Sequence, residues 1–393
     1  MEESRGMAVR KRGQVRVIEA VFAVFMAVAL ILMVMGFTRP FRSQYIRETS
    51  DLRRLAYNVM STMSQANTFE ATLAERIWAI YDSGGMWQPA VERLRELELI
   101  LSMSLPPGLL YRMDVYLLSA SGGAVEAKYL GFASNYDADA VWLTEAESIT
   151  YTYTMTGSKS LSYSDGFDYS SLPRFIFTIT NGHPNTNVFI KTSGTVSKPP
   201  SLCTQVDARG DLYGIAAAVY DVVSTLDLVP AAGFTVVVTG SYSRDSVDRR
   251  NNVAYVSVGV DSDWDGLVDV EYIFYRYDTS DGPGKIISIF VSRYAEVCSV
   301  GSDGSCNPVD ARIKAYNLGS MISGYTYSWN CVIPSTRGRV IGVALVVVDA
   351  DTSDPRGARG DFWLDWDDLQ LNWGYENIRG TVLQIHLTIG YAG

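Results

Sequence analysis

An uncharged run of nineteen residues, from Ala20 to Thr38, constrains the fold of this chain more than any other feature of its sequence. As a helix rising about 1.5 Å per residue, the run extends roughly 28 Å, which is close to the thickness of the hydrocarbon core of a bilayer. A helix that is apolar all round must be covered by lipid or by other helices. We therefore expect a membrane-spanning helix at about residues 18–38.

The charges around this run predict its orientation. Five basic residues precede it, namely Arg5, Arg10, Lys11, Arg12 and Arg16. Because a basic excess favours the cytoplasmic side, the N-terminus is predicted inside and the rest of the chain outside the cell. A cleaved secretory signal would have a shorter apolar core followed by small residues, which residues 34–40 do not provide.

The junction before the apolar run reads Arg10-Lys11-Arg12-Gly13-Gln14, and Glu19 stands near the start of the run. This junction resembles the class III signal peptide of archaeal type IV pilins. The resemblance implies cleavage between Gly13 and Gln14, after which the helix stays on the mature protein. It also implies self-association into a filament, in which Glu19 pairs with the free amine of a neighbouring subunit. A plain signal-anchor, with Glu19 at the level of the lipid headgroups, is the alternative.

Apolar residues keep a helical spacing beyond the membrane run. Leu52, Leu55, Val59 and Met63 recur every three to four residues, and residues 106–108, Pro-Pro-Gly, end the helical part. The layout resembles the head-proximal part of archaeal pilin-like proteins. We predict a leader at 1–13, a hydrophobic helix at 14–60, a helical stalk with the first head strand at 61–123, and an extracellular β region at 124–393 that a boundary near 193–233 would divide.

Short alternating segments predict strands throughout the β region. Arg174–Ile179 and Phe234–Gly240 alternate between apolar and polar residues, and Gly, Ser, Asn and Asp fill the gaps between such segments. Many short strands with turns of this kind favour a sandwich or a barrel. The Ala- and Val-rich segment at 212–228 is compatible with either a helix or a buried strand.

The last third of the chain contains a distinctive strand-like segment, Gly360-Asp-Phe-Trp-Leu-Asp-Trp-Asp-Asp-Leu-Gln-Leu371. It resembles the closing strand of jelly-roll carbohydrate-binding modules, and the likeness covers roughly Phe234–Leu371. The resemblance implies an all-β, jelly-roll-like sandwich and exposed aromatic rings that stack on sugars. The candidates for such stacking are Trp363, Trp366 and Trp373. Packing of these three rings in the core is the alternative that we favour.

The most specific motif is Asp261-Ser-Asp263-Trp-Asp265-Gly266-Leu267-Val-Asp269. Oxygen ligands at alternating positions can surround one hard cation, and a glycine allows the sharp turn. Tyr272 stands where an EF-hand would need its last Glu, and the flanks read as strands. The motif therefore resembles the calcium loop of integrin α-subunit repeats, which lies in a β-hairpin. We predict structural Ca²⁺ bound by the carboxylates of Asp261, Asp263, Asp265 and Asp269 and by the carbonyl of Leu267. A solvated acidic turn is the alternative.

Four cysteines follow the apolar run: Cys203, Cys298, Cys306 and Cys331. An even number on the outer side of a membrane favours disulfides. The short loop between Cys298 and Cys306 predicts that these two pair, which leaves Cys203 with Cys331. Free buried thiols are the alternative.

Charge and composition exclude some classes of function. A net charge of −10 and a pI of about 4.9 argue against a nucleic-acid partner. Only His183 and His386 are present, and no phosphate loop or nucleophile elbow occurs, so we predict no enzyme activity. We predict a structural or adhesive cell-surface protein of pilin type. The alternative is a membrane-anchored extracellular module that binds carbohydrate, with a cell-surface glycan as its partner, and never assembles.

Overall fold

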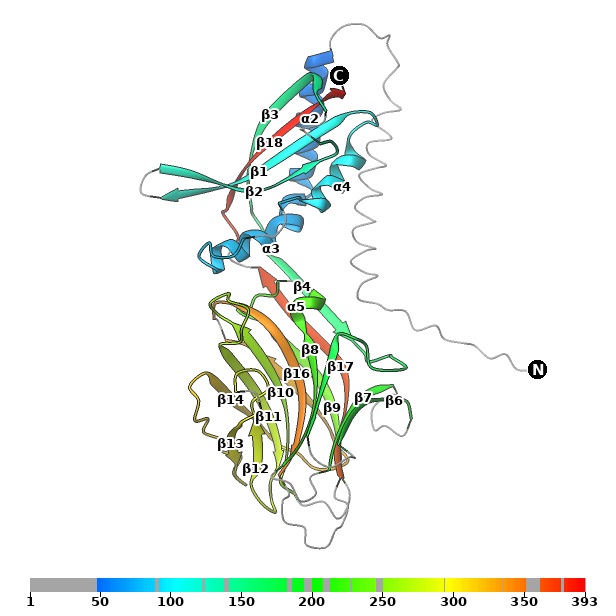
Figure 1. The fold of residues 1–393 in the computed structure, drawn as a ribbon, viewed down its shortest axis with the longest axis vertical. Coiled ribbons are helices and arrows are strands. Elements are labelled where there is room, and N and C mark those ends of the chain that lie inside the picture. Colours follow the sequence, from blue (N-terminus) through cyan, green and yellow to red (C-terminus); the bar gives the residue numbers. More distant parts are fainter. Residues whose placement is uncertain are drawn as a thin grey trace, which may run out of the picture. The chain divides into compact units, whose positions relative to one another are not determined.

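The computed structural model describes residues 48–88, 92–121, 124–137, 141–181, 186–193, 200–207, 213–226, 228–244, 250–292, 294–334, 336–350, 361–375 and 378–392. The chain forms two compact units (Figure 1). Among the described residues, the first unit comprises 48–81, 87–159 and 375–392, and the second comprises Asp82–Met86 and Ser160–Gly374.

The first unit is a four-stranded antiparallel sheet covered by helices. Its helices are α2 (Glu48–Gln65), α3 (Thr68–Asp82) and α4 (Arg95–Ser104), and its strands are β1 (Leu110–Ser121), β2 (Ala124–Ser134), β3 (Leu143–Thr154) and β18 (Val382–Ala392). The strand order is β2-β1-β18-β3. Helix α2 packs on β3 and β18, and α4 packs on β2.

The apolar spacing of α2 explains this packing. Leu52, Val59 and Met63 are buried against the sheet, because residues three to four apart share one face of a helix. Alternate residues of the strands, such as Val115 and Ile385, are buried on the same side. The sheet therefore has one apolar face under the helices and one polar face.

The predicted boundary at residue 124 does not divide the chain as the structure does. Strands β2 and β3 belong to the first unit, and the C-terminal strand β18 lies between β1 and β3. Nine consecutive residue pairs join β1 to β18, from Leu110 with Gly390 to Leu118 with Val382. The C-terminal segment thus completes the sheet that the predicted stalk begins, and the second unit is an insertion between β3 and β18.

The second unit is a β-sandwich. Its elements are β4 (Lys159–Asp165), β5 (Ile176–Asn181), β6 (Asn187–Lys191), β7 (Ser201–Asp207), β8 (Gly214–Asp221), α5 (Val222–Leu226), β9 (Thr235–Arg244), β10 (Asn252–Asp261), β11 (Val270–Asp278), β12 (Gly284–Ile287), β13 (Glu296–Val300), β14 (Ile313–Ser320), β15 (Thr326–Val332), β16 (Arg339–Asp349) and β17 (Asp361–Tyr375). The segment at 212–228 contains both a buried strand, β8, and a short helix, α5.

Two six-stranded sheets form the sandwich (Figure 1). The first, here called the β10 sheet, has the order β14-β11-β10-β16-β8-β5. The second, here called the β17 sheet, has the order β15-β9-β17-β7-β6, and β4 pairs with another part of β17. The largest buried rings of the β17 sheet include Trp329 and Trp366, whose centroids lie 4.8 Å apart.

A third layer, the hairpin of β12 and β13, covers the β10 sheet. Ile286 and Val297 of this hairpin join a core cluster with Val253, Tyr255 and Ile273. Strand β10 is consequently buried on both faces along its whole length. Burial on both faces explains why its sequence is almost continuously apolar instead of alternating.

Several predicted features fall outside the described residues. These are the leader at 1–13 with Gly13 and Gln14, the membrane span at about 18–38 with Glu19, and residues 14–47 of the predicted hydrophobic helix. None of the helices in the described ranges is long and apolar enough to cross a membrane.

The four cysteines behave in two ways. Cys298 and Cys306 form the predicted disulfide, with 5.6 Å between their Cα atoms. The predicted pairing of Cys203 with Cys331 is wrong, since both are free and buried. Cys203 lies in β7 and Cys331 in β15, and the strands β9 and β17 separate them within one sheet. A disulfide cannot span that separation.

Candidate functional site

The predicted calcium loop lies at the turn between β10 and β11. These strands pair antiparallel from Asn252 with Asp278 to Val260 with Val270, so the loop sits in a β-hairpin. Two of its residues, Trp264 at φ 68° and Gly266 at φ 91°, adopt the left-handed conformation that a tight turn needs. The loop therefore folds back so that side chains two residues apart point to a common centre.

Three carboxylates of the loop converge. Asp261, Asp263 and Asp265 each offer an oxygen, and these oxygens lie within 4.8 Å of one another. Two oxygens that bind one Ca²⁺ at about 2.3–2.6 Å can be separated by at most about 5 Å. The spacing thus fits one calcium ion. Asp263 and Asp265 are exposed, whereas Asp261 is fully buried.

The backbone of the loop holds these carboxylates in place. The amide of Trp264 donates to Asp261 Oδ1 at 2.7 Å, and the amide of Gly266 donates to Asp261 Oδ2 at 3.0 Å. Arg339 adds two hydrogen bonds to Asp261 Oδ2, at 3.0 and 2.9 Å. These bonds fix both oxygens of Asp261 within the turn.

Charge repulsion remains in the loop despite Arg339. The backbone N–H of Asp265 lowers the pKa of Asp263, but partial desolvation and the carboxylates of Asp265, Asp269 and Asp261 together raise that pKa above its ordinary value. A cation at the centre would relieve this repulsion.

One other predicted ligand, Asp269, is placed differently, whereas ligation by the carbonyl of Leu267 stays a prediction. Asp269 lies outside the group of three, and its Oδ2 accepts from the amide and hydroxyl of Ser262, both at 2.7 Å. The side chain of Leu267 is 64% exposed, and its amide donates to Asp265 Oδ1 at 2.7 Å. Asp269 thus braces the start of the loop.

A second candidate surface is the outer face of the β17 sheet, which is the face turned away from the β10 sheet. Strand pairing places Trp363 beside Gln205 and Ser243, and places Asp365 beside Cys203 and Ser241. Directly paired residues of neighbouring strands point to the same side. The same face includes Phe189, Lys191, Thr239, Thr326, Ser328, Asn330 and Asp367.

A buried ion pair organises this face. Lys191 Nζ lies 3.1 Å from Asp365 Oδ2 and 5.6 Å from the centroid of the Trp363 ring. Asp365 is fully buried, and the neighbouring Cys203 thiol has a raised pKa, first because of burial and then because of the Asp365 carboxylate. The ion pair fixes the lysine beside the half-buried indole.

The three predicted tryptophans separate into two groups. Trp366 is fully buried, and its indole N–H donates to Thr204 Oγ1 at 2.9 Å. Trp373 is 8% exposed. Both rings pack in the core, as the favoured alternative expected, and neither is the exposed stacking platform that the resemblance implied. Only Trp363 among the three reaches the outer face.

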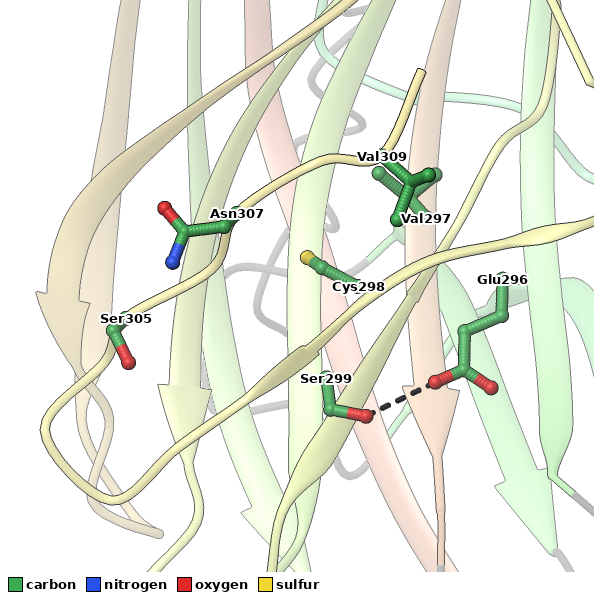
Figure 2. A pocket seen from close by; sticks show the side chains of 7 residues that line it. All are labelled: Glu296, Val297, Cys298, Ser299, Ser305, Asn307 and Val309. Atoms are coloured by element: carbon green, nitrogen blue, oxygen red, sulfur yellow. Dashed lines mark hydrogen bonds between the residues drawn. The ribbon is translucent and has the colours of Figure 1, made fainter.

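A pocket of about 460 Å³ lies beside the disulfide (Figure 2). It is lined by Glu296, Val297, Cys298, Ser299, Ser305, Asn307 and Val309. Ser299 donates to Glu296 Oε1 at 3.0 Å, and Lys285 pairs with Glu296 Oε2 at 3.0 Å. The one carboxylate of the lining is therefore already engaged by the Ser299 hydroxyl and by Lys285.

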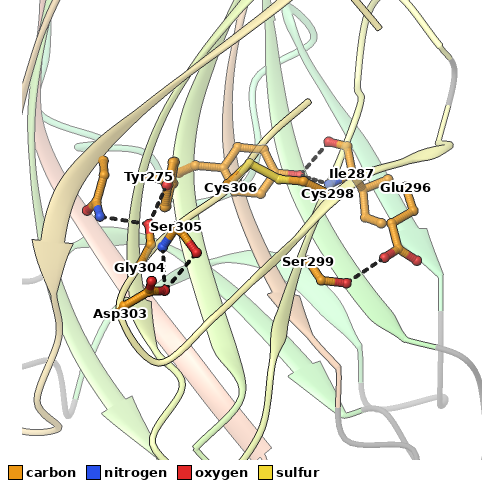
Figure 3. Close-up of a disulfide and its surroundings, with 11 residues drawn as sticks. Tyr275, Ile287, Glu296, Cys298, Ser299, Asp303, Gly304, Ser305 and Cys306 are labelled. Carbon is orange, nitrogen blue, oxygen red and sulfur yellow. Dashed lines mark hydrogen bonds between the residues drawn. A yellow bond between two sulfur atoms is a disulfide. The ribbon is translucent and has the colours of Figure 1, made fainter. Parts of the chain in front are cut away.

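The disulfide joins Cys306, in the loop between β13 and β14, to Cys298 of β13 (Figure 3). The hydroxyl of Tyr275 donates to the carbonyl of Gly304 at 2.7 Å, and Asp303 Oδ1 accepts from the amide of Ser305 at 3.0 Å. The pocket thus has a rigid wall on the side of residues 303–306.

Sequence reasoning missed Lys191, Asp365 and a buried carboxylate, Glu271. Glu271 is fully buried in β11 and accepts hydrogen bonds from Ser257, Ser288 and three amides at residues 289–291. For Asp365 and Glu271, a carboxylate flanked by apolar residues was the available signal.

No protein-family model matches the sequence, and no curated protein matches it. Among solved structures, the K3 adhesin domain of Lys-gingipain from Porphyromonas gingivalis has a TM-score of 0.27 and 11% identity, covering 53% of this chain and 97% of that chain. A carbohydrate-binding module of the β-sandwich superfamily has a TM-score of 0.26 and 8% identity, covering 66% and 85%. The C-terminal family 22 carbohydrate-binding module of Clostridium thermocellum Xyn10B has a TM-score of 0.26 and 9% identity, covering 56% and 94%. At these TM-scores the likenesses assign no function, and the description of the sandwich rests on its own strand order.

Proposed function

We propose that this chain is an extracellular carbohydrate-binding protein whose second unit holds saccharides on the outer face of the β17 sheet. The observation that carries the proposal is the combination, on one sheet face, of the half-buried Trp363 ring with the fixed Lys191–Asp365 pair. Rows of hydroxyl and amide side chains from β9, β15 and β7 surround them.

The chemistry of this face suits a sugar. One side of a pyranose ring presents C–H groups, which pack on an aromatic ring, while its hydroxyls donate and accept hydrogen bonds at the edge. Thr239, Ser243 and Gln205 supply groups that both donate and accept. Ligand sites commonly combine aromatic packing with a few well-placed polar groups in this way. The proposed role is binding and not catalysis.

The calcium loop has a structural part in this proposal. Asp261, Asp263 and Asp265 would hold Ca²⁺ at the turn of the β10–β11 hairpin, with Asp269 bracing the loop or completing the shell through water. The ion would fix one end of the two central strands of the β10 sheet.

Replacing Trp363 with Ala is expected to weaken saccharide binding at least about tenfold, because the substitution removes the aromatic packing surface. The measurement is affinity electrophoresis of the purified protein in gels that contain cellulose derivatives, xylan, galactan or mannan. Phe177→Ala is the matched control, since Phe177 is 55% exposed on β5 of the other sheet. Failure of the wild-type protein to bind any of these polysaccharides would refute the proposed function, and so would an unchanged affinity in Trp363→Ala.

A second part of the proposal concerns how the protein is displayed at the cell surface. Nine residues, 39–47, separate the apolar run from helix α2, which packs on an antiparallel sheet; this suits a head carried on an N-terminal helix. We propose pilin-type processing between Gly13 and Gln14. Intact mass of the protein from its native membrane is expected to lack the first thirteen residues. Gly13→Leu should restore the full length, and Glu19→Ala should permit cleavage but impair self-association. A full-length wild-type protein that extracts as a monomer would favour a plain anchor.

A further inference from the structure

One cation of the sandwich, Arg276, pairs with no carboxylate of the part of the chain that the structure describes. Arg276 of β11 points toward β15, where its guanidinium carbon lies 5.2 Å from the Tyr327 ring centroid and 5.5 Å from that of Trp329. Its Nη2 donates to the carbonyl of Ser328 at 3.0 Å. The guanidinium therefore lies between β11, the second strand of the β10 sheet, and β15, the edge strand of the β17 sheet.

Arg276 has N–H groups that donate to no acceptor among the described residues. Its buried Nε has no hydrogen-bond partner, and no carboxylate pairs with it among the described residues. Burial lowers the pKa of Arg276, and only Tyr327 and Cys331 oppose that effect. By contrast, Arg339 pairs with Asp261 and Arg312 pairs with Asp310. A guanidinium has five N–H donors, and the described residues give Arg276 one hydrogen-bond acceptor, the carbonyl of Ser328. The hydrogen bonding of this side chain is therefore incomplete.

Two exposed tyrosines flank Arg276 in the strand register: Tyr316 pairs with Phe274, two residues before Arg276 in β11, and Tyr325 precedes Tyr327 by two residues. Tyr316 of β14 is 39% exposed and stacks on Phe274 of β11, with 5.0 Å between centroids and 15° between planes. Tyr325, in the turn before β15, is 61% exposed. Gly319 contributes no side chain here, and a Cβ at that position would lie 3.6 Å from Arg276 Nη1.

We propose that this edge, formed by Arg276, Tyr316, Tyr325 and Tyr327, is a second saccharide site that binds the carboxylate of a uronic acid. The planar fork of the guanidinium matches a planar carboxylate, and the tyrosine rings pack against the sugar. The inference rests on the proposed function in that the ligand is a saccharide, but the site is separate from Trp363.

Charge makes the site selective. The chain as a whole carries a net charge of −10, so it repels polyanions in general. Binding of an acidic sugar must then come from a local cation that lacks its own counter-charge. Arg276 is such a cation, whereas an arginine already paired with a carboxylate would gain little from a ligand.

The test compares oligogalacturonate with its methyl ester, which has the same backbone without the charge, in isothermal titrations of the folded protein. The wild type is expected to bind the acid at least about tenfold more tightly than the ester. Arg276→Met should abolish this difference, and Arg276→Lys should restore part of it. Arg312→Met, which removes an exposed and paired arginine, should leave the difference unchanged.

Three results would overturn the inference: no preference for the acid in the wild type, a preserved preference in a folded Arg276→Met variant, or equal binding of polyglutamate, which would make the surface a docking site for acidic peptides. Trp363→Ala separates this inference from the proposed function. If that variant keeps the Arg276-dependent preference while neutral polysaccharides bind to neither protein, the edge site stands and the outer-face site fails. If neutral polysaccharides bind to the wild type and Trp363→Ala weakens that binding, while no preference for the acid depends on Arg276, the edge site alone is refuted.

Discussion

Replacing Glu271 with Gln is expected to lower the free energy of unfolding of the second unit by about 2–4 kcal/mol, because its buried carboxylate accepts hydrogen bonds from five donors. Its Oε1 accepts from Ser257 Oγ at 2.6 Å and from the amide of Ile289 at 2.9 Å. Its Oε2 accepts from Ser288 Oγ at 2.5 Å and from the amides of Phe290 and Val291 at 3.2 and 3.1 Å.

A glutamine cannot satisfy these donors. The two serine hydroxyls can rotate to accept from the new NH₂ group, but a backbone N–H cannot change from donor to acceptor. An NH₂ group in the position of Oε1 opposes the amide of Ile289, and one in the position of Oε2 opposes two amides. At least one buried N–H therefore loses its partner in either orientation.

The loss also disturbs packing nearby. The segment that Glu271 holds carries Phe290, whose ring rests on Gly259 of β10 and Gly342 of β16, where an added Cβ would lie within 2.8 and 2.9 Å of it. Thermal denaturation followed by circular dichroism should show a decrease in melting temperature of roughly 5–15 °C for a unit of this size. Glu296→Gln is the control, because that carboxylate is 40% exposed and its pair with Lys285 adds little. Equal melting temperatures for the two variants would contradict the role given to Glu271.

Local patterns were sufficient for the local features. Alternating apolar residues predicted a mostly β chain, a short spacing predicted the Cys298–Cys306 disulfide, and the aspartate spacing predicted a tight turn between two strands. Each of these features depends on residues close in sequence, whose geometry follows from bond lengths and backbone conformation.

Features that depend on distant pairing were not predictable in this way. Strand β18 pairs with β1 across more than two hundred residues, and nothing in its own alternation identifies the partner. The separation of Cys203 from Cys331 depends on the order of strands in the sheet, which the cysteine count does not contain. Whether a tryptophan of β17 points inward or outward depends on register, since a shift of one residue exchanges the faces of a strand.

The candidate surface on the β17 sheet shows the same limit. Lys191 and Asp365 are far apart in sequence and become partners only because β6, β7 and β17 are neighbours. Arg276 is recognisable as unusual only once the ion pairs of the described residues are known, since none of them includes it. Ion pairs that cross a sheet thus carry information about function that a single sequence does not display.

Removal of calcium is expected to destabilise the second unit, because an ion bound only to the folded state adds stability by mass action. At a free concentration one hundred times the dissociation constant, the gain is about 2.7 kcal/mol. Melting temperatures are measured in EDTA and in excess Ca²⁺, with Mg²⁺ as the ionic control. Mg²⁺ prefers a smaller octahedral shell at about 2.0–2.1 Å and gives up its water reluctantly, so it should stabilise less.

Substitutions assign the calcium effect to the loop. Asp263→Ala combined with Asp265→Ala removes two exposed carboxylates of the converging group but leaves Asp261 paired with Arg339. The double variant should melt at one temperature with or without calcium. Its melting temperature in EDTA should match or exceed that of the wild type, because the repulsion that raises the pKa of Asp263 is gone. Asp303→Ala, in an acidic turn that has no converging carboxylates, should keep the full calcium response. A wild-type protein with the same melting temperature in EDTA and in calcium would leave the three aspartates as a solvated turn, held by Arg339 and backbone amides alone.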